Sequence, residues 1–184
     1  MRHLIWCRFE RLAYCGRPSQ AGAGFSGRHA PRTSAGMSVL EVIHPVRFDD
    51  LPGVVDVWEA SIRAAHACVS EAYIRFFVPL ARDELLRLVD LGSVRDAKGT
   101  IIGFVGLADG KIEALFVHPA WRRRGVGRRL ATYAVSRGAT TVDVDELNDE
   151  GVSLFRGLGF EIVARSDVDA MGKAFPMLHL RLRS

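Results

Sequence analysis

Cysteine is scarce in this chain, and long apolar runs are missing. The three cysteines, Cys7, Cys15 and Cys68, contain no CxxC pair, so they form neither a disulfide framework nor a zinc site. No apolar run approaches the roughly 18 residues that a membrane-spanning helix needs. Collagen and coiled coils are excluded by the composition as well. What is present, 48% hydrophobic and 25% charged residues in 184 positions, is enough for one compact domain with a real core.

Positive charge is concentrated at the start of the chain. Residues 1–36 hold six arginines and one acidic residue, giving a net charge of +5, whereas residues 37–184 carry −1. Because this larger part is nearly neutral, the electrostatic argument for a nucleic-acid partner is weak. We expect neither a nucleic acid nor a membrane as a partner.

The first 36 residues differ from the rest in composition. Residues 16–36 are rich in Gly, Ala, Ser, Pro and Arg and show no strand or helix periodicity. We expect residues 1–36 to be a flexible extension or the product of a misassigned start codon, with an Arg-rich targeting peptide as the alternative. The folded domain is predicted to span residues 37–184, in a cytoplasmic protein.

From Met37 onward the sequence predicts alternating strands and helices. Apolar spacing predicts a helix over Asp50–Ala67 and a helical region over Ser70–Asp90, which Pro79 should break or kink. Two more helices are expected, at Gly125–Arg137 and Asp149–Leu158. Seven strands are expected, at Glu41–Arg47, Ser93–Asp96, Ile101–Leu107, Lys111–Val117, Thr140–Asp145, Glu161–Arg165 and Met177–Arg183. This order predicts an α/β (α+β) fold, with a mixed, mostly antiparallel sheet of six or seven strands and about four helices.

The most informative segment is residues 112–130, where an apolar strand leads into Arg-Arg-Arg-Gly-Val-Gly and a helix begins. Gly125 and Gly127 remove side chains where backbone N–H groups converge, and the helix start adds its positive dipole end. The segment therefore suits a diphosphate. Five arginines supply further positive charge: Arg122, Arg123, Arg124, Arg128 and Arg129. The alternatives are a solvated helix start, a tight turn or a contact for a nucleic-acid backbone; neither a Walker loop nor a dinucleotide fingerprint matches.

Two motifs together carry a family resemblance. Arg122-x-x-Gly125-x-Gly127, after an apolar strand and a Val-His-Pro step, resembles motif A of the GNAT N-acetyltransferase superfamily. Residues 148–160, in which an Asn precedes a helix that ends in an aromatic residue and Gly-Phe, resemble its motif B. Residues 165–176 are similar to small bacterial members of the YjaB/YafP-like type. The resemblance covers about residues 41–184 and implies the GNAT fold.

The resemblance also implies an activity and a binding site. The chain would transfer an acetyl group from acetyl-CoA, as co-substrate and without a metal, to a primary amine of a small molecule or peptide by direct attack on the thioester. In this family the fourth strand separates from its neighbour and pantetheine pairs with the exposed backbone. Here that backbone would be Leu115, Phe116 and Val117, with Asn148 bonding the pantetheine arm and Phe155 in the cofactor site. The diphosphate would lie on Arg122, Arg123, Arg124, Gly125, Val126, Gly127, Arg128 and Arg129.

Acetyl transfer needs a neutral amine, an oxyanion site and a leaving thiolate. We expect Glu113 to act as the general base through a water, with Asp143 as a second candidate. His66 falls where relatives often carry a histidine and is a third candidate. All three also have structural interpretations, as strand residues facing solvent or as a helix-end histidine. A backbone N–H at residue 116 or 117 would receive the oxyanion.

One residue departs from the family pattern. Phe155 stands where the family frequently has a Tyr that protonates the departing sulfur. Because a thiol with a pKa of about 8.5 is a good leaving group, this weakens catalysis without abolishing it, and a water, Tyr73, Tyr133 or His66 could substitute. The departure leaves open a catalytically weak acyl-CoA sensor, and the arginine cluster leaves open a tRNA-directed acetyltransferase. A homodimer through a sheet edge or the terminal strands is also compatible with the sequence.

Overall fold

The computed structural model describes residues 42–65, 71–85, 90–168 and 174–183. The predicted N-terminal extension and His66 lie outside these residues, so the statements about them, and about the domain boundary at residue 37, stay predictions.

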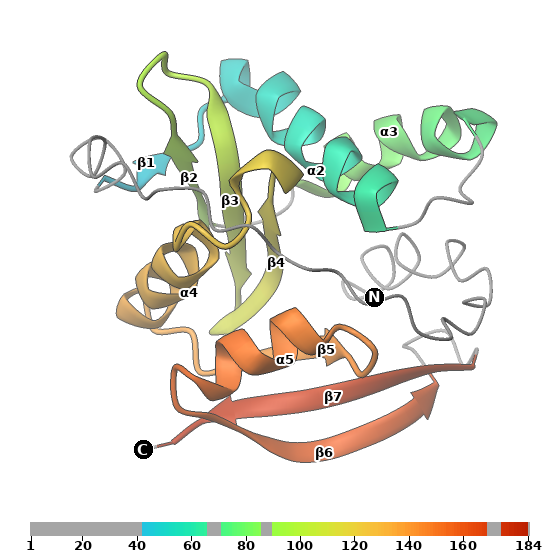
Figure 1. Ribbon diagram of the computed structural model, residues 1–184, viewed down its shortest axis with the longest axis vertical. Coiled ribbons are helices and arrows are strands. Elements are labelled where there is room, and N and C mark those ends of the chain that lie inside the picture. Colours follow the sequence, from blue (N-terminus) through green and yellow to red (C-terminus); the bar gives the residue numbers. More distant parts are fainter. Residues whose placement is uncertain (1–41, 66–70, 86–89, 169–173, 184) are drawn as a thin grey trace, which may run out of the picture.

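A seven-stranded sheet runs through the molecule in the order β1-β2-β3-β4-β5-β7-β6 (Figure 1). All neighbouring strands are antiparallel except β4 and β5, which are parallel and joined by a helical crossover. The strands are β1 (His44–Pro45), β2 (Asp90–Arg95), β3 (Ile101–Ala108), β4 (Lys111–Val117), β5 (Thr141–Asp145), β6 (Phe160–Val168) and β7 (Ala174–Leu182). The predicted mixed, mostly antiparallel sheet is confirmed.

Helices cover both faces of the sheet. Within the described residues there are four α-helices and two short 3-10 helices, which are η1 (Phe48–Asp50), α2 (Leu51–Ala65), α3 (Glu71–Leu85), η2 (Pro119–Trp121), α4 (Val126–Ser136) and α5 (Asp149–Arg156). One core lies where α2 and α3 pack on β3 and β4, and a larger one lies where α4 and α5 pack on the opposite face. Trp58 and Phe104 are the largest fully buried side chains of the first core. Each buried side chain of this kind contributes about 1.5–3 kcal/mol relative to an exposed one.

Several predicted elements differ from the structure. Asp90, predicted as the end of a helical region, begins β2. Helix α3 continues through Pro79, so a break at this proline is wrong, whereas a kink stays a prediction. The proline is exposed while Phe77 and Ala81 are buried against α2, and this packing holds the helix together across the missing N–H. Strand β1 is shorter than predicted, because only His44 and Pro45 pair with β2 in the ladder and the chain turns into η1 at Phe48.

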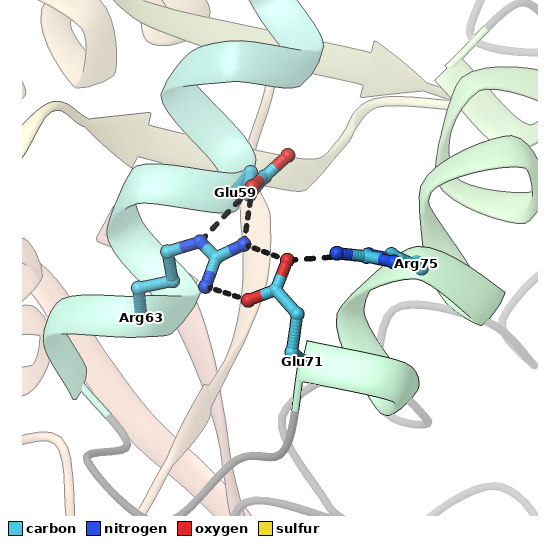
Figure 2. A network of polar contacts seen from close by, with 4 residues as sticks. All are labelled: Glu59, Arg63, Glu71 and Arg75. Carbon is cyan, nitrogen blue, oxygen red and sulfur yellow. Dashed lines mark hydrogen bonds and ion pairs between the residues drawn. The ribbon is translucent and has the colours of Figure 1, made fainter.

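A network of exposed charges joins α2 to α3 (Figure 2). Arg63 bonds Glu59 at 2.7 Å and Glu71 at 2.7 Å, and Arg75 lies 3.5 Å from the Glu71 carboxylate. The hydrogen bond from Arg63 lowers the pKa of Glu71 below its ordinary value. The two helices are thus tied together on either side of residues 66–70.

Candidate active site

Strands β4 and β5 separate soon after they meet. They pair at Lys111 with Thr141 and at Ile112 with Val142, and among the described residues no further part of β4 pairs with β5. On its other edge, β4 stays paired with β3 as far as Val117. The edge formed by residues 113–117 is therefore open toward β5, and an open strand edge can pair with an extended chain that carries amides.

A β-bulge in β4 marks the point where the strands separate. Gly106 pairs with Ala114 and Leu107 with Ile112, which leaves Glu113 as an extra residue in β4. A bulge bends its strand and increases the local twist. Glu113 thus sits at the apex of the opening, directly after the last residue of β4 that pairs with β5.

The far end of the opening leads into the predicted glycine loop. Helix α4 begins at Val126, and Gly125 is its N-cap with φ +83° and ψ −4°. This left-handed conformation favours glycine. Since glycine has no side chain to cap the helix, the first N–H groups of α4 are available to an anion, where the helix dipole favours negative charge.

Gly127 lies in the first turn of α4, beside β4 and α5. A Cβ at this position would lie 3.5 Å from Leu154 of α5 and 3.7 Å from Val117 of β4. The first turn of α4 therefore faces the end of β4 and the side of α5, so the loop and the opening are parts of one site. The predicted arrangement of an apolar strand, a glycine loop and a helix is confirmed.

The arginines of the loop supply positive charge around the helix start. Arg124 lies over the Trp121 ring at 4.9 Å, in a cation–π contact. The Nη1 atom of Arg129 is buried and has no hydrogen-bond partner among the described residues. The glycine-capped helix start and the surrounding arginines together suit a diphosphate group.

Asn148 and Phe155 both have structural roles. The Asn148 side chain caps α5 by accepting a hydrogen bond from the Gly151 N–H at 2.9 Å. Phe155 is 4% exposed and packs edge-on against Phe160 at 5.4 Å. Their predicted contacts with the cofactor stay predictions.

Tyr133 does not replace the missing tyrosine. Its hydroxyl lies 3.5 Å from the Asp90 carboxylate on β2, two strands away from β4 in the sheet. Burial and the nearby Asp90 raise the pKa of Tyr133. The structure therefore directs this hydroxyl away from the opening.

A chain of polar side chains starts at the apex of the opening. The Lys111 ammonium lies 2.6 Å from Oδ2 of Asp143 and 4.0 Å from the Glu113 carboxylate. Oδ1 of Asp143 lies 2.7 Å from Nδ1 of His179, and Nε2 of His179 lies 2.6 Å from the Ser166 hydroxyl. Burial raises the pKa of Asp143, but the hydrogen bonds from Lys111 and His179 outweigh it and hold this pKa below its ordinary value.

The structure thus brings the two predicted carboxylates together and adds three residues that the sequence analysis missed. Lys111, His179 and Ser166 come from β4, β7 and β6, and only the strand pairing brings them to one place. The available signal was the alternation of β7, where His179 lies between the buried Leu178 and Leu180 and so must face the other side of the sheet.

No group of three or more His, Cys, Asp or Glu side chains among the described residues could hold a metal ion. None of the helices in the same part of the chain is long and apolar enough to cross a membrane.

Comparison with known proteins gives consistent results. The acetyltransferase (GNAT) domain family matches residues 90–162. The peptidyl-lysine N-acetyltransferase YjaB of Escherichia coli K12 is 32% identical over 135 residues, which cover 73% of this chain and 91% of that protein. The solution structure of apo YjaB from Escherichia coli superimposes with a TM-score of 0.64 at 31% identity, covering 76% of this chain and 95% of YjaB.

A more distant structure shows the same fold. The PaiA N-acetyltransferase of Thermoplasma acidophilum, solved with coenzyme A, gives a TM-score of 0.57 at 19% identity over 76% of this chain and 98% of that one. The separated strands, the glycine-capped helix and these similarities agree. This chain therefore belongs to the GNAT superfamily, and it is an N-acetyltransferase that transfers an acetyl group from acetyl-CoA to an amine.

Proposed function

We propose that the acceptor of this enzyme is the side-chain amine of a lysine in a protein or peptide. The observation that carries the proposal is the charged apex of the β4 opening, where Glu113 and Asp143 flank a single lysine, Lys111. The name peptidyl-lysine N-acetyltransferase, given to the YjaB relatives, supports this acceptor class. A small-molecule amine is the alternative acceptor.

Acetyl-CoA supplies the activated acetyl thioester. We assign its diphosphate to the first N–H groups of α4, which Gly125 leaves uncapped, and to the arginines of residues 122–129. We assign the pantetheine arm to the backbone of residues 115–117, which is open toward β5. The Asn148 side chain, at the start of α5, would contribute a hydrogen bond to the same arm.

The charges at the apex favour a cationic acceptor. Glu113 and Asp143 carry two negative charges and Lys111 carries one positive charge, so the group is negative overall and attracts an ammonium ion. Glu113, whose side chain is 13% exposed, would accept a proton from the amine through a water. Asp143 already accepts two hydrogen bonds and has a lowered pKa, so we assign it a positioning role.

The experiment is an assay of thiol release from acetyl-CoA with two acceptor panels, lysine-containing peptides and small amines. We expect turnover with the peptides to exceed turnover with free amines of equal basicity. Turnover only with small amines would contradict the proposed acceptor. Tight binding of coenzyme A with no turnover on either panel would favour the acyl-CoA sensor, and salt-dependent RNA binding that coenzyme A does not displace would favour the tRNA-directed enzyme.

Two further properties stay predictions. Strand β6 is an edge strand with exposed Ile162 and Val163, which is compatible with a homodimer through the sheet edge. The cytoplasmic location has no structural counterpart. Sedimentation of the purified protein and microscopy of a tagged copy would test them.

A further inference from the structure

Lys111 has no role in the mechanism described so far, although it occupies the apex of the opening. Its side chain is 17% exposed, and its ammonium lies between the two candidate carboxylates. Placing three charges in a partly buried position is unfavourable unless the geometry is well satisfied. Such an arrangement at a site of chemistry suggests a functional role for the central cation.

The order of the binding positions along β4 places the thioester near Lys111. The diphosphate position lies after the carboxyl end of β4, at residues 122–129, while the apex lies at the amino end, at Lys111 and Ile112. A pantetheine arm that starts at the helix and pairs along residues 115–117 continues toward the apex. The thioester at the end of this arm is thereby directed to the end of the opening where the Lys111 ammonium is held.

We propose that Lys111 is a catalytic residue, namely the cation that stabilises and protonates the thiolate of coenzyme A as it departs. This inference rests on the proposed binding mode of the co-substrate. Lys111 would then protonate the departing sulfur in place of a tyrosine. Phe155 has no proton to give, and the Tyr133 hydroxyl is directed away from the opening.

The proton balance of the step closes with the residues at the apex. The acceptor first loses its ammonium proton to bulk water; the neutral amine nitrogen then forms a bond to the acetyl carbon, the carbon–sulfur bond breaks, and its electron pair moves to sulfur. Lys111 gives one proton to the sulfur, and the proton lost by the attacking nitrogen passes through a water to Glu113. Because Glu113 lies 4.0 Å from the Lys111 ammonium nitrogen, it can return that proton to the lysine and restore both groups.

The remaining members of the chain fix the position of the cation. Asp143 bonds Lys111 with one oxygen and His179 with the other, and Ser166 bonds the far nitrogen of His179. A carboxylate that is bound at both oxygens cannot rotate away from the lysine. Asp143, His179 and Ser166 are therefore positioning residues that hold Lys111 at the apex.

The test measures the ionisation of bound coenzyme A directly. The ultraviolet absorbance of its thiolate is titrated against pH in the complex with the enzyme, with desulfo-coenzyme A as the blank. The Lys111 ammonium lowers this midpoint, whereas the carboxylates of Glu113 and Asp143 raise it, so the wild-type value is the reference. Lys111→Met removes the one positive charge of the group and should raise the midpoint by about one pH unit or more, a tenfold change in the ionisation constant.

Activity provides the second measurement. Lys111→Met should lower kcat by about 100-fold, within the range for loss of a general acid, while the affinity for coenzyme A is largely retained. Lys111→Arg, which keeps the charge, should keep the wild-type midpoint. Lys98→Met, an exposed lysine in the β2–β3 turn, is the matched control and should change neither quantity.

The outcomes are distinguishable. If Lys111→Met binds coenzyme A and leaves the thiol midpoint unchanged, the proposal is wrong, even if the activity falls. If Lys111→Met does not fold, Lys111→Gln provides the test, because it also removes the positive charge and should raise the midpoint in the same direction. Failure of the wild-type enzyme to bind coenzyme A would overturn the proposed function itself.

Discussion

The two ends of strand β4 are built in different ways. At its carboxyl end the site consists mainly of backbone, with a glycine in a left-handed conformation and the N–H groups of a helix start. At its amino end the site consists of side chains from four strands, joined by hydrogen bonds and ion pairs. We infer that the backbone end determines the affinity for the co-substrate and that the side-chain end determines the rate of transfer.

The largest expected effect is a loss of coenzyme A affinity when the backbone end is blocked. Gly127→Leu should fill the space beside Leu154 and Val117 and weaken coenzyme A binding by about 100-fold, or about 2.7 kcal/mol. Calorimetry with coenzyme A measures this effect. Gly127→Ala is the control, because its Cβ would make ordinary contacts of 3.5 Å or more. Equal affinities of the two variants would contradict the account.

A smaller effect is expected from the side-chain end. Asp143→Asn removes the charge that anchors Lys111 and should lower kcat by about 10-fold, less than loss of a group that itself transfers a proton. The dissociation constant of coenzyme A should stay unchanged. Steady-state kinetics at saturating acetyl-CoA, together with calorimetry, separates the two quantities. If Asp143→Asn changed only the affinity for coenzyme A and not kcat, the side-chain end would not determine the rate of transfer, and the account would be contradicted.

The same residue predicts how stability depends on pH. Because folding lowers the pKa of Asp143, its ionised form stabilises the folded state above the ordinary pKa of about 3.9. That contribution is lost as the pH falls through the lowered pKa of the folded state. Denaturant titrations of the wild type and Asp143→Asn should therefore differ most near neutral pH and converge in acid. A difference that grows toward low pH would contradict this assignment.

The smallest effect is expected away from both ends. Arg63→Gln removes the ion pairs that join α2 to α3 (Figure 2). Since these side chains are exposed to water and screened by salt, the loss of stability should be small. Thermal unfolding at low and high salt measures it, and kcat should stay unchanged because the network lies outside the site. A large drop in the unfolding temperature would show that this network does more than join two exposed helices.

The comparison also explains what the sequence could predict. The backbone end was predictable because its glycines, arginines and helix start are contiguous in the chain and depend on local conformation. The side-chain end was predictable only in part. Glu113 and Asp143 are chemically conspicuous, but Lys111, His179 and Ser166 come together through the pairing of β5 with β7 and of β6 with β7, which depends on the whole sheet.

Two elements were predicted wrongly for the same reason, because contacts distant in the sequence determine their structure. The sequence around Pro79 predicts a broken or kinked helix, but α3 is continuous, with Phe77 and Ala81 buried against α2. The hairpin of β6 and β7 is longer than predicted. Its polar residues Ser166 and Asp167 resemble a turn locally, yet they extend a strand because β7 supplies hydrogen-bond partners.

The most direct test of the central claim compares two glycines that share one conformation. Gly125 and Gly99 both have φ +83° and open space where a Cβ would lie, but only Gly125 begins α4. Calorimetry of coenzyme A with Gly125→Glu should show a loss of at least about 30-fold, and with Gly99→Glu less than about threefold. Both variants should lose a similar stability of about 1–2 kcal/mol. If Gly125→Glu binds coenzyme A as tightly as Gly99→Glu does, the helix start does not hold the co-substrate and the account is wrong.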